Sequence, residues 1–165
     1  TPKPSSAASD VYKRQVMDHA FSTQSYQTYG RNFFLTEEIM RYCWFTYLVN
    51  EADGASPYAS PLRVQSVKGL PPATVLVSEY DPLRDEGEAY AQRLRDGGIA
   101  AQDHRLPGMV HACIHMLGLT PAARRLFDLA GQAMLAALGA GDTPVATGCR
   151  AAAPPGRSVG QRAPG

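Results

Sequence analysis

The chain has 165 residues, and its 16 Lys and Arg against 15 Asp and Glu give a formal net charge of +1. This length fits one domain, and the balanced charge argues against a nucleic acid or an anionic membrane as partner. No apolar run reaches the roughly 18 residues that span a membrane. Three cysteines, an odd number without C-x-x-C spacing, argue against a disulfide framework or a zinc ribbon and favour a reduced, cytoplasmic location.

Composition divides the chain into three parts. Residues 1–15 are polar and patternless, and we expect a disordered segment or one that is not native to the protein. Residues 139–165 are rich in Ala, Gly and Pro without apolar periodicity, which predicts a disordered tail. Residues 16–138 have an ordinary globular composition and are expected to hold the fold.

The predicted elements begin with a helix capped by Thr36, whose first turn carries Glu37 and Glu38. A loop over residues 50–72, rich in Gly, Pro, Ser and Asp, precedes a β-branched, almost wholly apolar run at 73–79. Such a run is typical of a parallel strand covered on both faces.

A second helix is expected to open with Pro82 at its first position and to end at Gly97 and Gly98. The next strand, 101–106, is polar enough for a sheet edge, where it could pair with a second copy in a homodimer. Thr120 and Pro121 begin the last helix. This order predicts an α/β fold with two to three parallel strands and flanking helices. Because so few strands make an incomplete sheet, we expect the C-terminal part of a larger α/β protein.

Two residues with catalytic chemistry follow the two predicted strands. Asp81 comes directly after the first strand, and His111 comes after the second. Active sites of open α/β sheets form outside the carboxyl ends of the strands, so the two side chains are expected to meet there. A carboxylate on one imidazole nitrogen would leave the other nitrogen to accept a proton from a nucleophile.

Structural roles compete with these assignments. An Asp before Pro is also an ordinary helix N-cap, and a single loop His is often only a polar residue. His111 and His115 have the spacing of a metal pair, but no third ligand stands at a useful distance, so no metal site and no cofactor are predicted. Cys113 has no feature that would activate its thiol and is expected to pack in the core.

Several motifs resemble a known family: 60–63 (SPLR), 69–73 (GLPPA), 79–87 (EYDPLRDEG) and 108–111 (GMVH). Together they resemble the bacterial hormone-sensitive-lipase-like esterases of the α/β-hydrolase fold. The resemblance implies a carboxylic-ester hydrolase acting through an acyl-serine, with a small ester as substrate. It makes Asp81 the triad acid and His111 the base, and it leaves Asp85 as a helix-start charge. Phe34 and Val110 are the candidates for the substrate-binding wall.

The sequence departs from that family at two places. Ala112 and Cys113 stand where the family usually has Gly and Phe. No G-x-S-x-G elbow and no His-Gly-Gly run precede Asp81, and the single literal match, around Ser158, lies in the tail after the His. We therefore expect a chain that lacks the nucleophile and the oxyanion hole and is inactive alone. The alternative is a non-catalytic relative that binds a small ligand.

Overall fold

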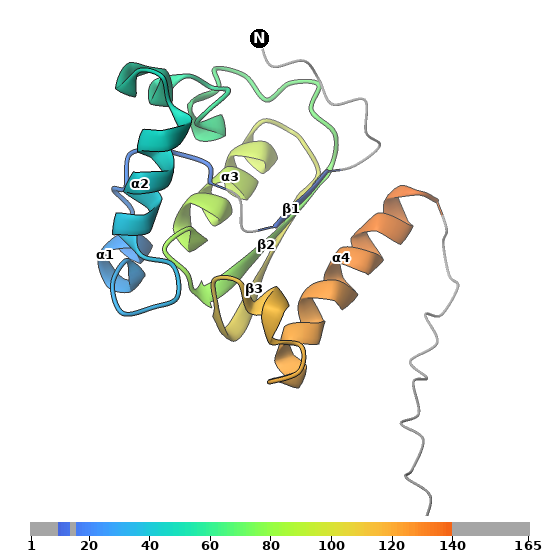
Figure 1. The fold of residues 1–165 in the computed structure, drawn as a ribbon. Helices are drawn as coiled ribbons and strands as arrows, with labels where there is room; N and C mark the ends of the chain where they lie inside the picture. The colour runs from blue at the N-terminus through green and yellow to red at the C-terminus, as the bar shows by residue number, and fades with distance from the viewer. Residues whose placement is uncertain (1–9, 14–15, 140–165) are drawn as a thin grey trace, which may run out of the picture.

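The computed structural model describes residues 10–13 and 16–139. In this part of the chain, three parallel strands form one sheet in the order β1-β2-β3, with β1 at Asp10–Lys13, β2 at Ala73–Tyr80 and β3 at Ala101–Val110. The α-helices are α1 (Gln24–Tyr29), α2 (Glu37–Tyr47), α3 (Arg84–Asp96) and α4 (Arg124–Ala137). Figure 1 shows the sheet between α3 and α4, with α1 and α2 at the left, beyond α3. The predicted α/β class is confirmed.

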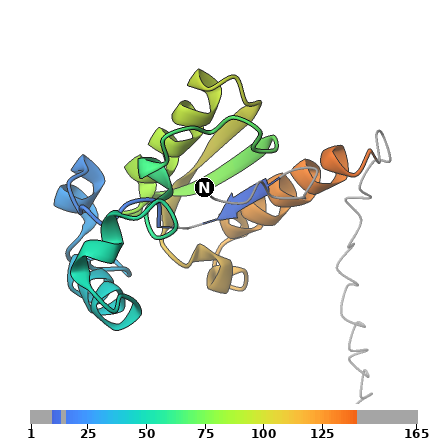
Figure 2. The same cartoon turned by 90° about the horizontal axis from the view of Figure 1, so that it is seen from above.

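The central strand β2 is covered on both faces, as its apolar run predicted. Val75 and Val77 pack with Ala91 of α3, whereas Leu76 points the opposite way, into a cluster with Leu126 of α4. Alternate strand residues point to opposite faces of a sheet, so this division follows from the sequence period. Seen from above, the two helices lie on opposite sides of the strands (Figure 2).

Two observed elements were not expected. Residues 10–13 form β1, which pairs in parallel with β2 from Asp10 opposite Ala73 to Lys13 opposite Leu76. We expected residues 1–15 to be disordered or not native to the protein, and the structure shows a strand over four of them, a stretch too short to carry a periodicity. The six-residue helix α1 also has no apolar repeat. Residues 1–9 and 14–15, and the predicted tail except Gly139, lie outside the described residues.

The predicted helices form with small shifts. The Thr36 hydroxyl accepts the Ile39 amide at 3.2 Å, so it caps α2 as expected. Pro82 does not open α3: it lies in a turn, and the helix begins at Arg84. A 3₁₀ turn over Pro121–Ala123 leads into α4. None of the helices in the described ranges combines the length and the hydropathy that crossing a bilayer requires.

The polar strand β3 lies at the edge of the described sheet. Two of its charged residues are paired with α3: Arg95 bonds Asp103 at 2.6 Å, and Arg105 contacts both carboxylate oxygens of Glu88 at 2.8 Å. Packing against a charged helix therefore accounts for much of the strand's polarity. Pairing of this edge with a second copy stays a prediction.

Candidate active site

Asp81 and His111 meet at the carboxyl end of the sheet. Asp81 follows β2, His111 follows β3, and Asp81 Oδ2 lies 2.8 Å from His111 Nδ1. The carboxylate is buried and 1 % exposed, whereas the imidazole side chain keeps 19 % of its surface. A buried carboxylate at this distance fixes the ring orientation and favours the tautomer with hydrogen on Nδ1. Nε2 is then the ring nitrogen left to exchange a proton with a reacting group.

The second oxygen of Asp81 serves the adjoining helix. Oδ1 accepts the Leu83 amide at 2.9 Å, and the Asp81 carbonyl accepts the Arg84 amide at 3.1 Å. Asp81 is therefore not the N-cap that local sequence suggested, because α3 begins at Arg84 and Leu83 holds the N-cap position. One carboxylate oxygen orders the turn before the helix, and the other contacts His111. The same side chain orders the start of α3 and orients the imidazole.

A bulge in β3 brings His111 to this position. Ser78 stands opposite Leu106, but Tyr80 stands opposite Val110, so β3 holds extra residues here. Gly108 adopts a φ of +71° within the bulge, a conformation that glycine accepts without steric cost. Its amide, turned away from the strand ladder, donates to Glu79 Oε2 at 2.6 Å. Glu79, which the sequence did not single out, thus holds the segment that leads into His111.

The two residues at which the sequence departs from the family motif follow the histidine directly. Ala112 has φ +65° and ψ 17°, in the left-handed region where a side chain is strained. A glycine at this place would adopt that conformation freely. Cys113 is buried against Leu106 and Leu126, with its sulfur 3.7 Å from the Ser78 hydroxyl. Its position in the core is that of a packing residue.

Aromatic side chains cluster beside Asp81. Tyr80, immediately before Asp81, stacks on Phe33 with ring centroids 5.8 Å apart, and Tyr29 meets both rings edge-on. The structure thus brings Phe33 rather than Phe34 against the residue beside Asp81. Phe34 is 62 % exposed. Val110 ends β3 opposite Tyr80, and its contact with substrate, like that of Phe34, stays a prediction.

A second carboxyl group, that of Glu86 in α3, is also buried. Glu86 is 1 % exposed, its Oε2 accepts the Asp18 amide at 3.0 Å, and its Oε1 has no partner among the described residues. Burial raises the pKa of Glu86 to about 8, against the lowering effect of the Asp18 and Met17 amides. Burial first, and then the charge of Glu86, also raise the pKa of the Tyr26 hydroxyl.

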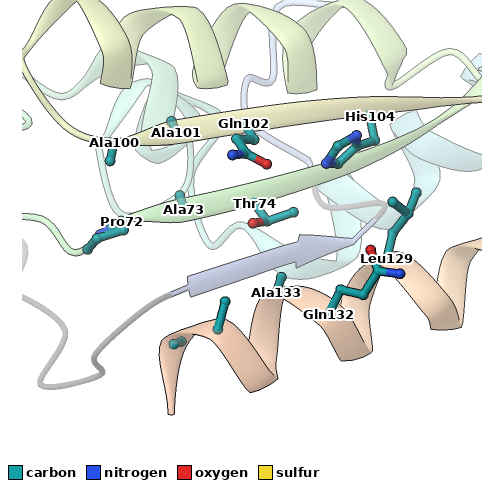
Figure 3. Close-up of a pocket in the computed structure, with 12 residues that line it drawn as sticks. Pro72, Ala73, Thr74, Ala100, Ala101, Gln102, His104, Leu129, Gln132 and Ala133 are labelled. Carbon is teal, nitrogen blue, oxygen red and sulfur yellow. The ribbon is translucent and has the colours of Figure 1, made fainter. Parts of the chain in front are cut away.

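A groove of about 760 Å³ lies elsewhere on the sheet. It runs between α4 and the first residues of β2 and β3, where Thr74, Gln102 and His104 face Gln132 of the helix (Figure 3). These residues begin the strands, whereas Asp81 and His111 follow their ends. The groove therefore lies at the opposite end of the strands from Asp81 and His111, neither of which lines it.

The other residues that the sequence suggested for metal binding or catalysis do not come together with the Asp81–His111 pair in the described residues. His115 is exposed on the 3₁₀ turn after Ala112, and no three His, Cys, Asp or Glu residues in the described ranges gather as metal ligands would. Ser158 lies outside those ranges. Among the described hydrogen bonds of His111 there is one to Asp81 and none to a serine.

Comparisons with known proteins agree with this geometry. A sequence model of the alpha/beta hydrolase fold matches residues 9–115. The chain is 37 % identical over 103 residues to the carboxylic ester hydrolase LipN of Mycobacterium tuberculosis, a match that covers 62 % of this chain and 27 % of that protein. It is 36 % identical over 111 residues to an arylesterase of Saccharolobus solfataricus, covering 67 % and 35 %.

Solved structures show the same likeness in three dimensions. A thermostable esterase from Pseudomonas putida superposes with a TM-score of 0.72 at 38 % identity, over 75 % of this chain and 40 % of that one. A thermophilic carboxylesterase cloned from a metagenomic library gives 0.76 at 34 % identity, over 79 % and 45 %. The chain thus spans less than half the length of these relatives. The four relatives named here are esterases, and the motifs of the chain resemble the hormone-sensitive-lipase-like carboxylesterases. Because the family model covers most of the chain, the chain belongs to the alpha/beta hydrolase fold family.

Proposed function

We propose that this chain supplies the acid and base of a serine carboxylesterase, with Asp81 orienting His111 and His111 acting as the general base. The observation that carries the proposal is the 2.8 Å contact between Asp81 Oδ2 and His111 Nδ1, made by a buried carboxylate and a partly exposed ring. A non-catalytic relative would have no need of this oriented pair, so the ligand-binding alternative is the weaker one.

The proposed reaction is acyl transfer from a carboxylic ester. A serine hydroxyl attacks the ester carbonyl while His111 Nε2 removes the hydroxyl proton, and the tetrahedral intermediate expels the alcohol, which takes that proton from the imidazolium. Water then repeats the sequence on the acyl-serine and releases the acid. Asp81 stays ionised and stabilises the imidazolium through Nδ1.

The serine and the oxyanion donors are proposed to come from the part of a longer protein that this chain does not include. The chain spans 27 % of one esterase relative and 35 % of another, and it has no G-x-S-x-G before Asp81. We expect the chain alone to hydrolyse esters at background rate, since loss of even one oxyanion donor costs ~10²–10³ in rate.

The test uses the longer protein and a p-nitrophenyl ester. His111→Ala is expected to remove most of the turnover, and Asp81→Asn to lower kcat by ~10⁴, because the wrong imidazole tautomer is then favoured. Ser60→Ala is the control. The Ser60 hydroxyl is also buried but binds the Gly54 carbonyl and neither Asp81 nor His111, so turnover is expected to stay as in the parent protein. Normal turnover by His111→Ala would refute the assignment. Labelling of Ser158 by a serine-directed phosphonate would instead show that the nucleophile lies in the tail.

A further inference from the structure

The turn that carries Asp81 is tied to α1 by one buried side chain. Ser25 lies in α1, is completely buried, and donates its hydroxyl proton to the Pro82 carbonyl at 2.6 Å. Pro82 directly follows Asp81 and has no amide hydrogen, so only its carbonyl can form a backbone hydrogen bond. The Ser25 hydroxyl binds this carbonyl and so holds the residue that connects Asp81 to the start of α3.

The hydrogen-bonding capacity of Ser25 is fully used at this place. A serine hydroxyl has one proton and two acceptor positions. Its oxygen accepts the Asp85 amide at 3.3 Å and lies 3.0 Å from Thr23 Oγ1, which must donate because the Ser25 proton goes to Pro82. The Ser25 amide donates in turn to Asp85 Oδ2 at 2.8 Å. Such complete satisfaction of a buried group is typical of a rigid junction.

The other side of the turn is held as well. Arg84 Nη1 donates to the Glu79 carbonyl at 3.1 Å, and Arg84 Nε donates to Asp85 Oδ1 at 2.9 Å. Asp85 therefore links Ser25 to Arg84 and is more than a helix-start charge. The end of β2, the Asp81 turn and the first turn of α3 are all connected through this set of bonds.

We infer that Ser25 is a positioning residue that keeps the Asp81 carboxylate within hydrogen-bond distance of His111. The inference rests on the proposed function, in which the Asp81–His111 pair orients the base. Without the Ser25 hydroxyl, the Pro82 carbonyl loses its buried partner, and the turn relaxes to find another. Because Asp81 Oδ1 is fixed to the same turn through the Leu83 amide, that relaxation moves Oδ2 away from Nδ1.

The experiment follows the His111 Nδ1 proton in this chain by NMR, using ¹⁵N-labelled histidine and measuring exchange of that proton with water. Asp81→Ala marks complete loss of the contact, because alanine has no oxygen to bond Nδ1. Ser25→Ala is expected to speed exchange about tenfold, the effect of one lost buried hydrogen bond. Ser60→Ala is the matched control: Ser60 is equally buried and donates to the Gly54 carbonyl at 2.7 Å. We expect less than about a twofold change there, since no bond to the Asp81 turn is lost.

Each outcome decides the matter. Faster exchange in Ser25→Ala alone supports the inference, whereas equal acceleration in both variants, or none in either, overturns it. If Ser25→Ala does not fold, Ser25→Cys replaces the hydroxyl with a thiol, a weaker hydrogen-bond donor of similar size, and is read in the same way. The result is separable from the proposed function: an unchanged Nδ1 signal removes the role of Ser25 only, whereas normal turnover by His111→Ala in the longer protein removes the catalytic assignment only.

Discussion

The buried carboxyl of Glu86 makes the stability of this chain depend on pH, and Glu86→Gln is expected to remove that dependence. The group is 1 % exposed, and burial raises its pKa from 4.5 to about 8. Between these two values, Glu86 is therefore protonated in the native state and ionised in the unfolded chain. The stabilising contribution is complete below pH 4.5 and is lost as the pH rises through about 8.

The size of the effect follows from proton linkage. Between the two pKa values the unfolded chain has released a proton that the native chain retains, so the free energy of unfolding falls by ~1.4 kcal/mol per pH unit. This amounts to about 3 kcal/mol between pH 5 and pH 7. Glutamine keeps an oxygen to accept the Asp18 amide and has no charge to desolvate. At pH 7 the variant is expected to be the more stable protein by a similar amount.

The assay is urea unfolding at several values of pH between 5 and 8, followed by the fluorescence of the single tryptophan, Trp44. Glu88→Gln is the matched control on the same helix, because its carboxylate is partly exposed and pairs with Arg105; the slope above pH 5 is expected to stay as in the parent. If the parent chain and Glu86→Gln lose stability in parallel over this range, Glu86 is ionised in the native state and the reasoning fails.

Three further outcomes are expected. Gly87→Ala should destabilise the chain by about 1–3 kcal/mol in urea unfolding, because an added Cβ would lie 2.7 Å from the Val77 side chain; a more stable variant would mean that α3 shifts freely. Iodoacetamide should modify the exposed Cys43 in the native chain and reach the buried Cys113 only in urea, and peptide mapping that finds both modified at equal rates would contradict the packing. Thr36→Ala should cost about 1 kcal/mol through loss of its cap on α2, and an unchanged urea midpoint would deny that role.

Sequence reasoning predicted that Asp81 and His111 would lie together, and the structure shows them in contact. Asp81 and His111 each follow a predicted strand, and parallel strands end at one edge of a sheet. The contact observed at that edge is the expected one. Residue spacing alone left open whether Asp81 was a helix N-cap or contacted the imidazole. The structure places Asp81 before the N-cap of α3, with one oxygen in the turn and the other against His111.

The residues around the Asp81–His111 contact were not identified from the sequence, for different reasons. Glu79 and Ser25 bind backbone groups of segments that are distant in the sequence, and no sequence pattern predicts such bonds. The only sequence feature that indicates the bulge is the glycine at position 108. Glu86 was accessible in principle: it lies three residues after Leu83 and four before Tyr90, on the buried face of the helix. A glutamate on an apolar stripe signals an unusual environment.

The bulge at Gly108 also limits how this region can change in length. Asp81 and His111 are separated by 30 positions, and the extra residues of β3 fall within that interval. Side chains of a strand alternate between its two faces, so deleting a single residue there would turn the imidazole toward the opposite face, far from its carboxylate. Insertions and deletions in relatives that keep this contact should therefore fall in the connection between α3 and β3, so that the length of the segment from the bulge to the imidazole stays constant.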